Sequence, residues 1–96
     1  MRVELEQQVV DFVRSLAPQP RRALREALRK LQKEEGDIRN LEADLEGFSR
    51  LRVARYRIIF FYEGRGRSRV IRCVHAGPRG LIYEIFAQQL QEFLQP

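Results

Sequence analysis

Alternation of apolar and charged residues in the middle of the chain predicts a β-hairpin. From Phe48 to Tyr62, large apolar residues alternate with arginine in two short runs that meet at Ala54-Arg55. Period-two alternation rich in Val, Ile, Phe and Tyr is typical of strands, and two such runs this close together favour a hairpin. A tight turn at Ala54-Arg55 places Val53 opposite Tyr56, and the further pairs are then Arg52 with Arg57, Leu51 with Ile58, and Arg50 with Ile59.

This register gives the hairpin two unlike faces. One face collects side chains that can be buried, namely Leu51, Val53, Tyr56, Ile58, Phe60 and Tyr62. The other face collects three arginines beside two apolar residues, namely Arg50, Arg52, Arg57, Ile59 and Phe61. Like charges directly opposite one another disfavour strand pairing, by roughly 0.2–1 kcal/mol. We interpret the arginine face as an anion site for phosphates; the alternative is a solvated outer face.

The first third of the chain follows helical spacing instead. Apolar residues at helical spacing predict two helices. The first begins at about Glu6 and has an apolar side made of Val9, Phe12, Val13 and Leu16. The second begins at about Pro20 and has an apolar side made of Leu24, Ala27, Leu28 and Leu31. Ala17-Pro18-Gln19-Pro20 separates them, because the residue before a proline avoids the α region. The apolar side of this helical hairpin needs a sheet to pack on. Val3–Leu5 is either a first strand or the lead-in to the first helix.

The last third predicts strands and a closing helix. Ile38–Glu46 is acidic and partly apolar, with Leu41 and Leu45 as anchors, and Glu63–Ser68 is a flexible basic turn. Arg69–His75 is expected as a third strand; pairing Tyr62 with Arg69 places Ile71 and Cys73 on the buried face and Arg72 on the arginine face. Leu81–Phe86 is expected as a further strand and Ala87–Leu94 as a short helix. The predicted fold class is α+β: one domain over 1–96, with a helical hairpin on one face of a small antiparallel sheet, in the order βααβββ(β) plus a short C-terminal helix.

Charge is concentrated in the predicted β-rich half. Residues 1–46 hold nine Lys/Arg and ten Asp/Glu (net −1), residues 47–85 hold nine Arg and two Glu (net +7), and residues 86–96 add one Glu (net −1), which gives the overall +5. Sixteen of the eighteen basic residues are arginine, the side chain that binds phosphate in a bidentate manner and stacks on bases. This distribution predicts salt-sensitive binding to a polyanion such as RNA.

The remaining chemistry is sparse. One His and one Cys do not make a usual zinc site, and no carboxylates have metal-ligand spacing, so neither a metal nor another cofactor is expected. Cys73 and His75 lie two apart on one strand and both point to the buried face in this prediction, which disfavours a nucleophilic Cys–His pair. A single cysteine and the absence of a long apolar segment predict a cytoplasmic protein without a membrane partner. Arginines and Tyr83 remain to bind and cleave RNA, whose own 2′-hydroxyl can attack the adjacent phosphate when held in line.

Three motifs in this order resemble the RelE/ParE superfamily of toxin–antitoxin toxins. They are the hairpin segment from Leu45 to Phe60, the strand Val-Ile-Arg-Cys-Val, and Pro78-Arg-Gly-Leu-Ile-Tyr83, after a helical hairpin with Ala-Pro-Gln-Pro between its helices. The resemblance implies a metal-independent endoribonuclease that cuts mRNA on the ribosome and pairs with an acidic antitoxin. Carried over, it implies that Arg50 and Arg52 bind the phosphate backbone, with Arg72 on the same face. It also implies that Arg57 stabilises the transition state, Arg79 the leaving group, and that Tyr83 stacks on the substrate or relays a proton.

Two departures keep other functions open. Some relatives carry a histidine directly before the C-terminal arginine, where this chain has Pro78, and His75 is displaced by three residues. Arginine also replaces the lysines of some relatives on the first hairpin strand, which favours phosphate binding over base catalysis. The alternatives are a ParE-like inhibitor of DNA gyrase, and a non-catalytic basic module that only pairs with an antitoxin.

Overall fold

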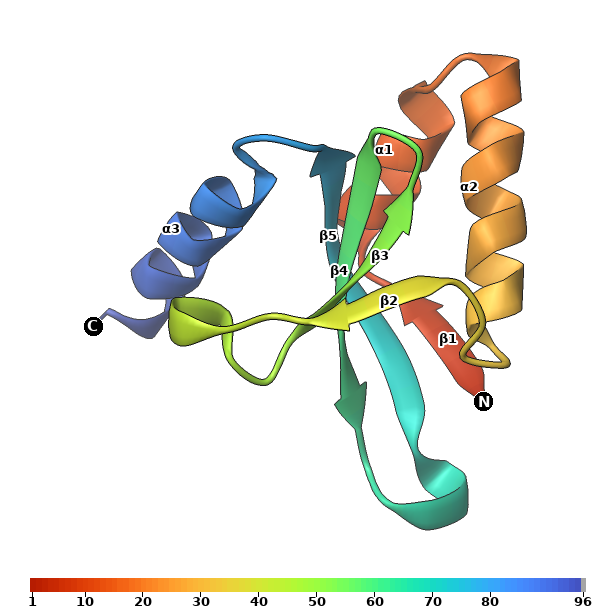
Figure 1. Cartoon of the computed structure of the whole chain (residues 1–96). Coiled ribbons are helices and arrows are strands. Elements are labelled where there is room, and N and C mark those ends of the chain that lie inside the picture. The colour runs from red at the N-terminus through yellow and green to blue at the C-terminus, as the bar shows by residue number, and fades with distance from the viewer. Residues whose placement is uncertain (96) are drawn as a thin grey trace.

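The computed structural model describes residues 1–95 as a five-stranded sheet with helices on both of its faces (Figure 1). The elements in chain order are β1 (Arg2–Leu5), α1 (Gln7–Ser15), α2 (Pro18–Leu31), β2 (Asp37–Asn40), β3 (Ser49–Val53), β4 (Tyr56–Glu63), β5 (Val70–Pro78) and α3 (Ile82–Leu94). The strands lie in the order β1-β5-β4-β3-β2; β1 is parallel to β5 and the other pairs are antiparallel. The α+β class is therefore confirmed.

The central hairpin has the predicted register. Val53 pairs with Tyr56, Arg52 with Arg57, Leu51 with Ile58 and Arg50 with Ile59. The two-residue turn at Ala54-Arg55 sets this register, and the alternation then fixes which side chains are buried. The predicted buried face packs under α1 and α2, in a core that includes Val9, Leu24, Leu28, Leu31, Leu51, Ile58, Phe60 and Ile71.

The C-terminal segment differs from its prediction. Leu81–Phe86 is not a strand: α3 begins at Ile82, so the expected short helix at Ala87–Leu94 is its second half. Ile82, Phe86 and Leu90 repeat every four residues and pack with Ile59 in a second apolar cluster. Since Ile59 lies on the arginine face, α3 covers part of that face, on the side of the sheet opposite the helical hairpin (Figure 1).

Strand β5 also differs in register. Tyr62 pairs with Ile71 rather than Arg69, and a bulge shifts the register between Ile59–His75 and Phe60–Cys73. The extra residue, Val74, reverses the alternation, because one inserted residue moves the following side chains to the other face. Cys73 therefore belongs to the core under α1, whereas His75 lies against Phe86 of α3. The prediction that both face the same side was wrong.

Two short edge strands close the sheet. Val3–Leu5 belongs to β1, which pairs with β5, and β2 pairs with β3 through the polar segment Asp37–Asn40. Strand β2 was not predicted, because its four residues contain a single apolar side chain. Leu41 and Leu45 act as the predicted anchors in the α3 cluster. Within residues 1–95, no helix is long and apolar enough to cross a membrane.

Candidate functional site

Two arginines meet at the tip of the β3–β4 hairpin. Arg52 and Arg57 are directly opposed, which brings their Cα atoms to about 4.5–5.5 Å. Arg52 is exposed and Arg57 is half-buried. Nη1 of Arg57 donates hydrogen bonds to the carbonyl oxygens of Ala54 and Tyr56, both at 2.9 Å. The turn therefore fixes one end of this guanidinium and leaves Nε and Nη2 for an anion.

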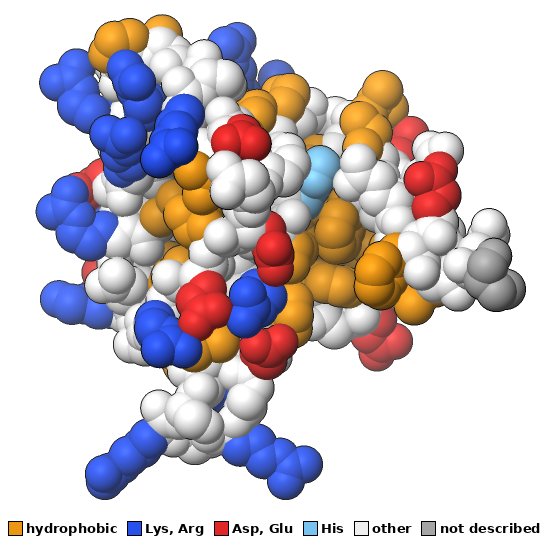
Figure 2. Space-filling view, turned by 180° about the vertical axis from the view of Figure 1, so that it is seen from behind, with side chains coloured by type: hydrophobic (Ala, Val, Ile, Leu, Met, Phe, Trp, Pro, Cys, Tyr) orange, Lys and Arg blue, Asp and Glu red, His pale blue; other side chains and the backbone are white. Residues whose placement is uncertain are grey.

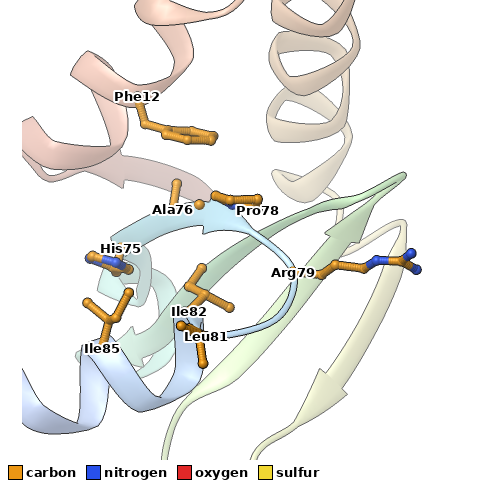
Figure 3. A pocket seen from close by; sticks show the side chains of 9 residues that line it. Phe12, His75, Ala76, Pro78, Arg79, Leu81, Ile82 and Ile85 are labelled. Atoms are coloured by element: carbon orange, nitrogen blue, oxygen red, sulfur yellow. The ribbon is translucent and has the colours of Figure 1, made fainter.

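The β5–α3 loop is attached to the same tip. The backbone N–H of Arg79 donates to the carbonyl oxygen of Arg55 at 2.7 Å. Arg57 pairs with Gly77 in β5, so the chain reaches Arg79 two residues beyond that pair. The Arg79 side chain is exposed and extends away from the apolar residues behind the loop (Figure 3). One end of the sheet thus gathers Arg52, Arg57 and Arg79.

Tyr83 lies in the first turn of α3, on the same face of the sheet. It is half-buried and packs against the cluster of Ile59, Ile82 and Phe86. Ile59 follows Arg57 by two residues, so both side chains project to this face. The structure therefore brings four of the six predicted site residues to one end of the molecule.

Arg50 is committed to an internal contact. Its side chain is buried, and Nη1 donates to the backbone oxygen of Asp37 at 2.7 Å and to Asp37 Oδ1 at 3.0 Å. This hydrogen bond lowers the pKa of the Asp37 carboxyl. Arg50 therefore joins β3 to the edge strand β2 rather than presenting its charge to solvent.

Arg72 lies far from Arg52, Arg57 and Arg79. It pairs with Phe61, four residues along β4 from Arg57, which corresponds to about 13 Å. Its guanidinium contacts the carboxylates of Glu4 at 2.8 Å, Glu6 at 3.5 Å and Glu63 at 3.0 Å. The hydrogen bond with Glu63, together with the charges of all three carboxylates, raises the pKa of Arg72. This charge is already balanced within the protein.

The cysteine and the histidine are separated by the sheet. Burial raises the pKa of the Cys73 thiol to about 12 and lowers the pKa of His75. A thiol held protonated on one face, with an imidazole on the other, does not form a nucleophilic pair. Within residues 1–95, no three His, Cys, Asp or Glu side chains gather in a way that would hold a metal ion.

An apolar cavity of about 460 Å³ lies behind the β5–α3 loop (Figure 3). Phe12 of α1 covers one side, Leu81, Ile82 and Ile85 the other, and His75 lies at one end. Sequence reasoning missed this cavity because its walls come from three elements that are far apart in the chain. The only signal was the apolar Leu81-Ile82 next to Pro78-Arg79, which fitted a strand equally well.

Comparisons with known proteins find the same overall fold among solved structures. A scan against protein-family models finds no match, and a search of curated proteins finds none either. Among solved structures, a YoeB/ParE toxin from Agrobacterium tumefaciens superposes with a TM-score of 0.67 at 14% identity, over 83% of this chain and 100% of that one. A RelB-RelE antitoxin-toxin complex from Methanococcus jannaschii gives a TM-score of 0.60 at 19% identity, over 86% and 98% of the two chains. Both show likeness of fold.

A third structure carries the assignment to a family. The archaeal RelE-RelB complex from Pyrococcus horikoshii OT3 matches with a TM-score of 0.62 and 30% identity, over 82% of this chain and 94% of that one. This identity holds over nearly the whole of the related chain, so the two proteins are alike in sequence as well as in fold. The chain belongs to the RelE/ParE superfamily of toxins from toxin–antitoxin systems.

Proposed function

We propose that this toxin is a metal-independent endoribonuclease that cleaves mRNA on the ribosome by attack of the RNA 2′-hydroxyl on the adjacent phosphate. One observation carries the proposal. Arg52, Arg57 and Arg79 converge at one end of the sheet, where the Arg79 N–H binds the Arg55 carbonyl at 2.7 Å. A cluster of fixed cations stabilises the negative charge that develops on a phosphate during attack.

Each residue has a role that follows from its surroundings. Arg52 is exposed and binds the RNA backbone, whereas Arg57, held by two carbonyl oxygens, stabilises the pentacoordinate phosphate. Arg79 stabilises the leaving oxygen. Tyr83, half-buried at the start of α3, stacks on a base or relays a proton. We assign no phosphate contact to Arg50 or Arg72, because carboxylates already occupy both guanidinium groups.

We also propose an acidic antitoxin as the partner. Two of the similar structures are complexes of a RelE toxin with RelB. The region from 47 to 85 carries a net charge of +7, and exposed arginines at the hairpin tip would attract an acidic partner. Binding there would cover the cluster that we assign to cleavage, so the antitoxin would inhibit cleavage by occluding this site.

Primer extension on a defined message translated in vitro tests the proposal. Wild-type protein is expected to give cleavage at codon-phased positions only when ribosomes are present. Arg57→Ala and Tyr83→Phe should lower the single-turnover rate, the arginine variant by roughly 10²–10³-fold, as for loss of one oxyanion-stabilising donor. Arg22→Ala removes an exposed arginine of α2 that forms no ion pair within residues 1–95; it is the matched control and should cleave like the wild type.

A DNA gyrase inhibitor is the second candidate, since one structural neighbour is named a YoeB/ParE toxin and Pro78 stands where some relatives have histidine. Supercoiling assays on the same preparation separate the two. Inhibited supercoiling without RNA cleavage would move the protein to the ParE branch. Neither activity, with tight antitoxin binding retained, would leave a non-catalytic binding module.

A further inference from the structure

The turn between β4 and β5 lies beyond the rest of the sheet. Strand β3 pairs with β4 only as far as Phe60, and β1 pairs with β5 only as far as Val70, the residue at which the pairing of β4 with β5 also ends. Residues 64–68 therefore form a tip beyond all neighbouring strands (Figure 1). Six residues of β4 separate Arg57 from Glu63, about 20 Å. The tip and the arginine cluster cannot contact the same phosphate.

The tip is a folded turn rather than a loose loop. The Ser68 hydroxyl donates to the carbonyl oxygen of Arg65 at 2.8 Å, and the backbone N–H of Ser68 binds the same oxygen at 3.2 Å. Gly64 has a φ of +88°, and a Cβ there would lie 3.1 Å from the carbonyl oxygen of Ser68. A side chain at this position would be both strained and crowded. These contacts therefore fix the backbone that carries Arg65 and Arg67.

These two charges are unbalanced. Glu63, the nearest carboxylate in sequence, is bound to Arg72 at 3.0 Å, and the Arg69 guanidinium lies 4.2 Å from the centre of the Tyr62 ring. Among residues 1–95, no ion pair involves Arg65 or Arg67, and both are exposed. Figure 2 shows two basic side chains spread apart at the end of the protrusion, with no acidic side chain between them.

We propose that the tip, residues 64–68, is a second RNA contact that grips phosphates about 20 Å from the cleavage site. This inference rests on the proposed function, because it adds a point of attachment to the same substrate or to ribosomal RNA. The tip contains no apolar side chain, and protein interfaces depend on buried apolar or aromatic anchors. A phosphate backbone needs only charge and a bidentate donor, which arginine supplies. The chemistry therefore favours RNA over a protein partner.

Salt-dependent binding of an isolated short RNA duplex, and of purified ribosomes, tests this directly. The double variant Arg65→Gln/Arg67→Gln is compared with Arg22→Gln/Arg25→Gln, which removes the same charge from exposed positions of α2. Over about 50–200 mM NaCl, loss of two phosphate contacts should reduce the slope of log K against log salt by roughly 1.4–1.8. The α2 pair should keep the wild-type slope. Polyglutamate serves as a polyanion without phosphates.

The outcomes separate this inference from the proposed function. A reduced slope for the tip variant alone supports the tip contact, even for a protein that cleaves no RNA in the primer-extension assay. Equal slopes for the tip pair and the α2 pair would overturn it, even where cleavage is intact. If the tip variant lost binding to polyglutamate and to RNA equally, the inference would also be overturned, because the tip would then recognise negative charge in general rather than phosphate. Matching thermal melting curves for both double variants show that folding is unaffected.

Discussion

At the scale of single residues, the hairpin turn is the most informative position. Ala54 has a φ of +53°, a left-handed conformation that costs a non-glycine residue roughly 1–2 kcal/mol. Glycine adopts this conformation without strain, but it loses more conformational entropy on folding, which offsets about 0.5–1 kcal/mol of the gain. Ala54→Gly should therefore raise the free energy of unfolding by about 0.5–1 kcal/mol, as measured by urea denaturation. Ala23→Gly, exposed within α2, should lower it by about 1 kcal/mol.

A glutamine continues the sheet where β1 ends. The Gln8 amide donates to the carbonyl oxygen of Ala76 and accepts from its N–H, both at 2.8 Å. Gln8→Leu leaves both backbone groups of this strand edge unpaired and should cost about 2–3 kcal/mol in urea denaturation. Gln7→Leu is the control, because the Gln7 amide contacts only the exposed Asp11. Equal losses of unfolding free energy at the two positions would show that the hydrogen bonds between Gln8 and Ala76 do not stabilise this strand edge.

His75 should make stability depend on pH. Burial lowers its pKa in the folded state below the ordinary value of 6.5. As pH falls below 6.5, the unfolded chain binds a proton that the folded protein resists, so stability present above pH 6.5 is lost progressively on acidification. Between pH 7.5 and 5.5, the wild type should lose more unfolding free energy than His75→Gln. Parallel pH profiles for the two proteins would show that His75 is not the group responsible.

Residue patterns fixed the register of the arginines but not their partners. The alternation in residues 48–62 was enough to pair Arg52 with Arg57, because period two and a two-residue turn leave one solution. The contact between Arg50 and Asp37 could not be foreseen, since it depends on an edge strand with almost no apolar signal. The three carboxylates around Arg72 come from two strands and the loop after β1, and only the tertiary fold assembles them.

At the scale of elements, short apolar runs were the source of the errors. Leu81–Phe86 contains a run that fits a buried strand or one turn of a helix equally well. The deciding fact is tertiary: Ile59 needs a cover on the arginine face, and a helix with Ile82 and Phe86 on one side supplies it. The Val74 bulge was equally invisible, because nothing in an apolar strand marks where one residue is added.

One buried arginine contributes to holding the edge strand β2. Arg50 is the side chain that ties Asp37 to β3, and β2 has only one partner strand. Arg50→Gln should therefore increase amide hydrogen exchange selectively in residues 37–40, while β4 and β5 stay protected. Arg22→Gln, which changes an exposed arginine of α2, is the control and should leave β2 unchanged. Uniform acceleration over all strands would instead indicate a global loss of stability.

At the scale of the whole molecule, the two faces of the sheet carry different features. The face under α1 and α2 holds the larger core, whereas the α3 face leaves room for an arginine cluster at one end of the sheet. The larger core and the proposed anion site thus lie on opposite sides of the same strands.

This division makes Cys73 a reporter of the whole fold. Its thiol is fully buried on β5, between β1 and β4, and burial raises its pKa to about 12. Reaction with a thiol reagent at pH 8 should therefore require global unfolding. The urea dependence of the labelling rate should then match the equilibrium m-value of unfolding. Rapid labelling at a rate that does not depend on urea concentration would mean that β1 and α1 open locally. The core under the helical hairpin would then not be one cooperative unit.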